Sequence, residues 1–139
     1  MTIYRKYKTI IFIIFSIASV WVLWNFGLKE IYLNHTFRTI QITSLENSKW
    51  LNLSKWKDQA AGQTYGIELE INGSTDRTIQ VLFGQEKNGM MQQVLLKKGT
   101  IDFEFMRDWY SDSCYLFFPS VTGAKVNLDI NYRFLGSSY

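Results

Sequence analysis

Hydrophobic and polar residues alternate along most of the chain after residue 37. The clearest run is AKVNLDINYRF, at 124–134, where one face collects Val126, Leu128, Ile130, Tyr132 and Phe134. A period of two places successive side chains on opposite sides of a β-strand. This run therefore predicts a strand with one buried face and one polar face.

The same alternation recurs in RTIQITS, YGIELEING, RTIQVLFG and GTIDFEF, and it places Tyr65, Ile67, Leu69 and Ile71 on one face of the second run. Less regular strands are expected at 49–53, within 90–98 and at 114–118. The dipeptides that favour turns are Asn72-Gly73, Asn88-Gly89, Lys98-Gly99 and Thr122-Gly123. About seven or eight short strands separated by turns predict a mainly β fold. We expect an antiparallel β-sandwich of the jelly-roll kind over residues 37–139.

A different pattern occupies residues 9–28, TIIFIIFSIASVWVLWNFGL, which contain no charged side chain. A helix of about 20 residues is about 30 Å long and matches the hydrocarbon core of a bilayer. The run therefore predicts a transmembrane signal anchor at 9–28, with Trp21 and Trp24 at the membrane interface. Residues 1–8 would form a short stub and residues 29–36 a tether. The alternative is a cleavable signal peptide, because Ser16-Ile17-Ala18 resembles a cleavage motif.

The distribution of charge predicts on which side of a membrane the N-terminus and the β domain lie. Arg5, Lys6 and Lys8 precede the apolar run, so the positive-inside rule places the N-terminus in the cytoplasm. The β domain would then lie outside a plasma or inner membrane, in the periplasm or the extracellular space. The net charge of +3 is too small to indicate nucleic acid as a partner.

The single cysteine, Cys114, excludes an internal disulfide and a cysteine-based zinc cluster. An exported domain without disulfides favours a bacterial envelope over a eukaryotic secretory route. Cys114 alternates with Leu116 and Phe118, so we expect it in the core as a small hydrophobe. If the chain were eukaryotic, glycosylation motifs would begin at Asn34, Asn52 and Asn72.

The stretch FMRDWYSDSCYLFFPS, at 105–120, offers the best candidate contact surface. Its polar connection carries Arg107, Asp108, Trp109, Tyr110 and Asp112. Sugars bind by stacking their C–H groups on aromatic faces and by hydrogen bonds to amides and carboxylates. Further candidates of these types are Trp50, Trp56, Asn127, Asp129, Asn131 and Arg133. The alternative is that the tryptophans close the ends of the sandwich core.

Two chemical roles for the acidic residues are open. Glu68, Glu70, Asp102 and Glu104 lie on polar strand faces and could form a glycosidase pair if their strands are neighbours. The alternative is a solvated sheet face. Asp76, Asp108 and Asp112 supply the hard oxygen ligands that suit calcium, although their spacing matches no calcium loop. Aspartates are also common in turns.

Three functions follow from these patterns. The first is a non-catalytic, membrane-anchored binding module that recognises a glycan, an envelope polymer or a partner protein. The second is an accessory subunit of a larger integral-membrane complex, in which small residues at 16–19 let another helix approach. The third is an envelope glycoside hydrolase. The partners implied are the lipid bilayer, a glycan or envelope polymer and other membrane proteins. No cofactor is implied, apart from the calcium alternative.

Overall fold

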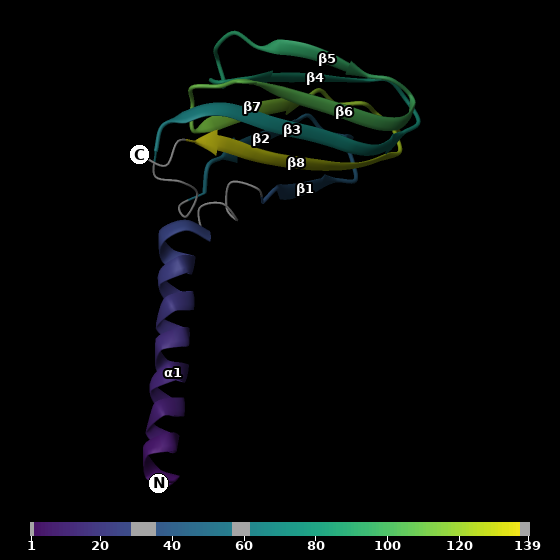
Figure 1. The fold of residues 1–139 in the computed structure, drawn as a ribbon. Helices are drawn as coiled ribbons and strands as arrows, with labels where there is room; N and C mark the ends of the chain where they lie inside the picture. The colour runs from purple at the N-terminus through teal and green to yellow at the C-terminus, as the bar shows by residue number, and fades with distance from the viewer. Residues whose placement is uncertain (1, 29–35, 57–61, 137–139) are drawn as a thin grey trace. The chain divides into compact units, whose positions relative to one another are not determined.

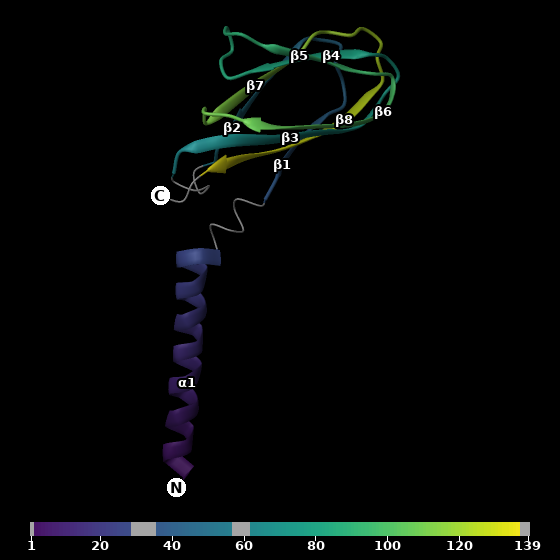
Figure 2. The same cartoon turned by 45° about the horizontal axis from the view of Figure 1, so that its top comes forward.

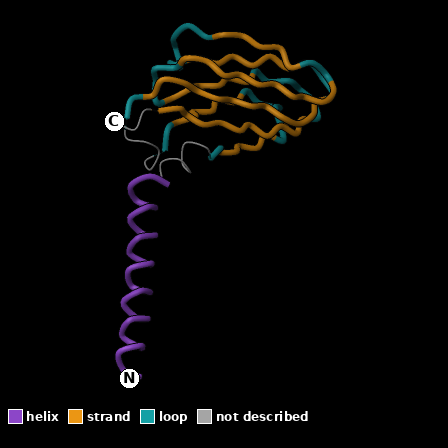
Figure 3. The backbone as a smooth tube through the Cα atoms, viewed as in Figure 1, coloured by secondary structure: helices purple, strands orange, loops and turns teal. Residues whose placement is uncertain are grey.

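The computed structural model describes residues 2–28, 36–56 and 62–136. The chain divides into two compact units, residues 1–33 and residues 34–139. Figure 1 shows the helix of the first unit and the strands of the second, and Figure 3 separates helix, strand and loop by colour. Sequence alternation and secondary structure agree over most of the second unit.

The first unit contains α1 (Thr2–Leu23), followed by the π-helical turn η1 (Trp24–Leu28). The large apolar side chains of α1 whose burial is described are exposed, among them Ile11, Phe12, Phe15 and Trp21. The Ser19 hydroxyl donates to the Phe15 carbonyl at 2.8 Å, so this polar group is satisfied by the helix backbone.

The prediction of a single membrane-spanning helix over 9–28 is not supported. The α-helical hydrogen bonding ends at Leu23, and a π-helical turn continues the chain. Within the described residues, no helix combines the length and the apolarity that crossing a bilayer requires.

The described residues of the second unit form eight strands, where the alternation predicted about seven or eight. They are β1 (Arg38–Ile42), β2 (Lys49–Ser54), β3 (Thr64–Thr75), β4 (Ile79–Gly84), β5 (Gln92–Leu96), β6 (Gly99–Asp108), β7 (Ser113–Phe118) and β8 (Val126–Gly136). One four-stranded sheet has the order β1-β8-β3-β6, and the other has the order β2-β7-β4-β5. All pairs are antiparallel, and Figure 2 shows the sheets as two facing layers. The predicted antiparallel β-sandwich is therefore confirmed.

The core lies between the two sheets and uses the apolar faces that the alternation identified. From β8 it takes Val126, Leu128, Ile130, Tyr132 and Phe134, all of which are buried. The rings of Phe83 (β4) and Phe105 (β6) join the layers with centroids 4.6 Å apart. Their edge-to-face arrangement is one that aromatic pairs prefer. The fold is therefore held mainly by apolar contact across the sandwich.

Two expectations about β3 are wrong. Tyr65 is 51% exposed, because the register between β3 and β8 shifts between Thr64 and Gly66 and turns this side chain away from the core. Asn72-Gly73 does not form a turn but lies inside β3. Gly73 has φ +137°, and a Cβ there would collide with the Asn127 carbonyl oxygen. Glycine is needed because the β8 backbone approaches closely at this point.

Candidate functional site

A pocket of about 310 Å³ lies between the β4–β5 connection and the C-terminal end of β6. Its lining comprises Phe83, Gly84, Gln85, Glu86, Gly89, Met90, Gln92, Phe105, Arg107, Asp108 and Trp109. A volume near 300 Å³ lies at the small end of the range for ligand sites. The pocket can therefore hold a compact ligand of about one ring with its substituents.

Aromatic side chains form the buried part of this lining. Phe83, Phe105 and Trp109 are all buried. Phe105 and Trp109 meet edge to face, with ring centroids 6.4 Å apart and an interplanar angle of 89°. These rings also pack in the sandwich core, so the core fixes their positions in the pocket.

Polar side chains line the exposed part of the pocket. Glu86 comes from the β4–β5 connection, whereas Arg107 and Asp108 end β6, and all three are exposed. The guanidinium of Arg107 lies over the Phe105 ring, 5.7 Å from its centroid. The ion pairs among the described residues join other side chains, so Arg107 forms none with Glu86 or Asp108.

The five candidate residues of the 105–120 stretch do not form a single surface. Trp109 is 4% exposed, so the expectation of a surface tryptophan is wrong. The alternative, in which a tryptophan closes the core, describes Trp109. Tyr110 is 68% exposed but does not line the pocket. Arg107 and Asp108 line it, together with the buried ring of Trp109.

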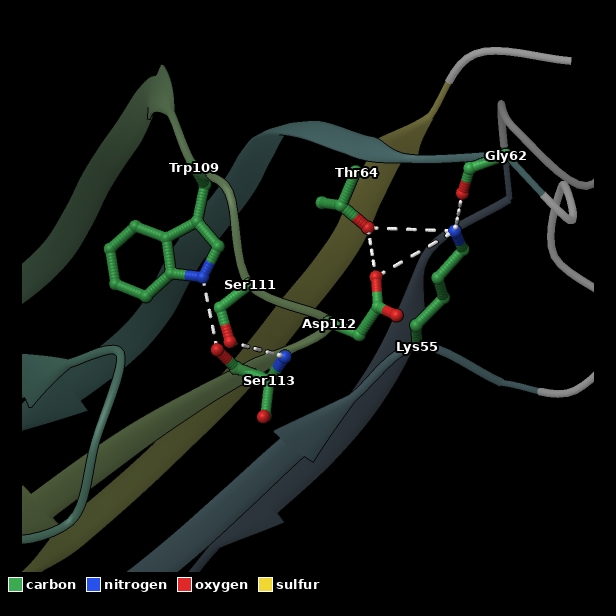
Figure 4. A network of polar contacts seen from close by, with 7 residues as sticks. All are labelled: Lys55, Gly62, Thr64, Trp109, Ser111, Asp112 and Ser113. Atoms are coloured by element: carbon green, nitrogen blue, oxygen red, sulfur yellow. Dashed lines mark hydrogen bonds and ion pairs between the residues drawn. The ribbon is translucent and has the colours of Figure 1, made fainter. Parts of the chain in front are cut away.

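Asp112 is held in a polar network that joins three parts of the sandwich (Figure 4). Lys55 Nζ donates to the Gly62 carbonyl at 2.7 Å and lies 3.7 Å from Asp112 Oδ1. The Thr64 hydroxyl donates to the same carboxylate oxygen. The Lys55 amide also donates to the Asp112 carbonyl at 2.8 Å. Asp112 therefore fastens its loop to β3 and to the end of β2.

The secondary tryptophans lie outside the pocket. Trp50 is paired across β2 and β7 with Phe117, and their ring centroids are 4.6 Å apart. The Lys87 ammonium lies 5.3 Å from the centroid of the Trp50 ring. The guanidinium of Arg38 lies 4.5 Å from the centroid of the Trp56 ring. Both tryptophans therefore already have partners within the protein.

The four candidates on β8 share the polar face of the first sheet and do not reach the pocket; they are Asn127, Asp129, Asn131 and Arg133. Asn131 accepts a hydrogen bond from the Thr39 hydroxyl at 2.7 Å and donates to Glu70 at 3.3 Å. Arg133 pairs with Glu68 at 2.5 Å. These contacts cross-link three neighbouring strands.

The strands that carry the acidic side chains, β3 and β6, are neighbours, as the hydrolase alternative requires. Glu70 lies directly opposite Glu104, and Asn72 separates Asp102 from Asp129 across three strands. These carboxylates lie on the polar face of the first sheet and outside the pocket. Their arrangement matches the solvated sheet face named as the alternative.

The three aspartates considered as calcium ligands each contact a different part of the protein. Asp76 accepts a hydrogen bond from the Lys125 amide at 2.9 Å, Asp108 lines the pocket and Asp112 joins the Lys55 network. In the part of the chain that is described, no three His, Cys, Asp or Glu side chains form a group that could hold a metal ion.

Cys114 is fully buried in the core, as the sequence predicted. Burial raises the pKa of its thiol from 9.0 to about 12, because the apolar surroundings disfavour the thiolate. The thiolate is the reactive form of cysteine, so this residue is inert at neutral pH.

The glycosylation motifs occupy different environments. Asn52 is exposed on β2, whereas Asn72 lies inside β3 between two hydrogen-bonded neighbours, β6 and β8. Asn34 lies outside the described residues. Trp21 and Trp24, the predicted interface residues, are exposed on the helical unit.

Sequence reasoning missed half of the pocket, namely the part supplied by the β4–β5 connection. The sequence GQEKNGM, at 84–90, predicts only a turn around Asn88-Gly89. Its Gln85 and Glu86 could have been recognised as candidates from their polarity, but only a tertiary arrangement places them beside β6. No known protein-family model matches the chain, and no characterised protein sequence matches it either.

Proposed function

We propose that this chain is a non-catalytic binding module whose pocket, between the β4–β5 connection and β6, holds one sugar unit of a glycan or envelope polymer. The observation that carries the proposal is the pocket itself, with buried aromatic rings beside exposed charged and amide side chains. The strand orders β1-β8-β3-β6 and β2-β7-β4-β5 support a jelly-roll assignment.

The chemistry of the lining supports a sugar. Phe105 and Trp109 supply apolar surface for C–H groups, while the amides of Gln85 and Gln92 can both donate and accept hydrogen bonds. Arg107 adds a donor for hydroxyl or carboxylate oxygens. Few ligand classes present apolar and hydroxyl surface on one ring, and sugars do.

The test measures binding of the full chain, purified in mild detergent, to an immobilised panel of glycans and envelope polymers. Gln92→Ala should weaken binding about threefold to tenfold, because it removes one hydrogen-bonding group. Gln93→Ala is the matched control, since Gln93 is the next residue of β5 and does not line the pocket. If the unmodified chain binds no member of the panel, the proposal fails.

The helical unit supports attachment of the chain to a lipid bilayer. Its exposed apolar side chains include Ile10, Ile14, Ile17, Val20 and Leu23, and burying such surface is favourable. A plasma or inner membrane of a bacterium, with the sandwich outside the cytoplasm, stays a prediction from the basic residues before α1. Protease added to intact spheroplasts should then digest the sandwich. A fully protected sandwich would contradict this location.

One observation favours the second function, an accessory subunit of a membrane complex. Ile14, Ile17, Ala18 and Trp21 line an apolar notch on α1, and Ala18 has the smallest of the four side chains. A large side chain of a neighbouring helix could enter such a notch. Ala18→Leu should then release the chain from a larger complex during native sizing. If the unmodified chain migrates alone, this function fails.

A further inference from the structure

The pocket carries unequal numbers of opposite charges. Its lining contains the carboxylates of Glu86 and Asp108 and a single charged base, Arg107. All three side chains are exposed and in contact with water. A ligand that fills the pocket removes some of this water, and it must then supply partners for the charges.

Among the described residues, no ion pair joins a basic side chain to Glu86 or Asp108. Arg107 forms no ion pair with either of them, and its guanidinium lies over the Phe105 ring. Lys87 follows Glu86 in the chain but does not line the pocket, and its ammonium lies over the Trp50 ring. Among the described residues that line the pocket, the acidic side chains of Glu86 and Asp108 therefore outnumber the single basic side chain of Arg107.

Gly84, at the end of β4, and Gly89, in the β4–β5 connection, allow the tight turn that carries Glu86. The Gly89 amide donates to the Glu86 carbonyl at 3.2 Å, and a Cβ on Gly89 would lie 3.0 Å from the Glu86 Cβ. A Cβ on Gly84 would lie 2.8 Å from the Met90 carbonyl oxygen. The tight turn thus brings Glu86 to the same pocket as Asp108.

We propose that the sugar unit held here is an amino sugar, whose ammonium group binds between the carboxylates of Glu86 and Asp108. Charge-assisted hydrogen bonds are about twice as strong as neutral ones, so the ammonium would contribute more than a hydroxyl at the same place. Arg107 and the glutamine amides then bind the oxygens of the ring. This inference rests on the proposed function and names the sugar class.

The experiment compares two probes that differ only in the amine. The full chain in mild detergent is titrated with a β-1,4-linked glucosamine tetramer and with its N-acetylated counterpart, in which each amine is a neutral amide. We expect the free-amine tetramer to bind at least about tenfold more tightly, as a charged hydrogen bond implies. Raising the salt concentration should reduce this preference.

Two variants locate the preference in the pocket. Glu86→Gln and Asp108→Asn should each reduce the preference for the free amine about threefold to tenfold, whereas Asp102→Asn, on the polar face of β6, should preserve it. Thermal unfolding verifies that each variant is folded. Equal binding of both tetramers would overturn the amino-sugar inference and leave the binding function intact. Binding of neither tetramer, together with binding of another glycan, would also overturn it, and no binding of any glycan would end both proposals.

Discussion

The indole Nε1–H of Trp109 donates a hydrogen bond to the backbone carbonyl of Ser113, 3.0 Å away. The Trp109 amide also donates to the Tyr65 carbonyl at 2.9 Å. These two hydrogen bonds fix the connection between β6 and β7 beside the buried Trp109 ring, and Figure 4 shows the bond from the indole to Ser113. The same ring lines the pocket, so the fold and the candidate site depend on one side chain.

Replacing this ring should destabilise the sandwich. Trp109→Ala should lower the free energy of unfolding by about 3–5 kcal/mol, because it leaves a large cavity and an unpaired carbonyl. Tyr110→Ala, at the exposed neighbouring position, should change it by no more than about 0.5 kcal/mol. Denaturant unfolding measures both values. Equal effects of the two substitutions would contradict the buried position of Trp109.

Lys55 and Thr64 should be energetically coupled through Asp112. The substitutions Lys55→Met and Thr64→Val each remove a partner from a network whose lysine side chain is only 10% exposed. Their combined effect should differ from the sum of the single effects by about 0.5–3 kcal/mol. A double-mutant cycle by denaturant unfolding measures the difference. Simple additivity would show that the network contributes no cooperative stability.

The glycines at 73 and 99 should respond differently to alanine. Both have positive φ, +137° and +115°, so either substitution strains the backbone, at a cost of about 1–3 kcal/mol. Gly73→Ala should cost more, because the new Cβ also collides with the β8 backbone at Asn127. At Gly99 the space is open. Thermal unfolding compares them, and an equal loss would refute the close approach at Gly73.

Cys114 should make the sandwich less stable in alkali. The thiol ionises above pKa 9.0 when the chain is unfolded, whereas burial raises its pKa to about 12 in the folded state. The unfolded state therefore releases this proton first, and stability falls as the pH rises from about 9 to about 12. Cys114→Ala removes this contribution, so its stability should fall less steeply over the same range. Parallel curves from pH-dependent denaturation would contradict the raised pKa.

The sequence predicts the sandwich well because burial repeats with the period of a strand. Val126 to Phe134 alternate in the sequence, and they alternate between core and polar face in β8. The prediction fails where a local irregularity breaks the period, as at Tyr65, where the register between strands shifts. It also fails at Gly73, since glycine signals a turn and a close backbone approach equally well.

The candidate site could be predicted only in part, because its two halves are joined by tertiary structure. Arg107 and Asp108 stand in a polar stretch that the sequence singles out. Glu86 lies in a different connection, and the two meet only because the β4–β5 connection lies beside the end of β6. Burial of Trp109 depends on the same arrangement. A single sequence contains no direct signal of such pairings.

The place of β8 in the first sheet has a consequence for how the protein folds during its synthesis on the ribosome. This strand lies between β1 and β3, although it follows both in the chain by many residues. Until residues 126–136 have been synthesised, β1 has no neighbour to pair with and one edge of β3 stays open. Long-range pairing of this kind folds slowly and leaves strand edges exposed meanwhile. Nascent chains that stall before β8 should therefore be clients of chaperones, while completed chains should not.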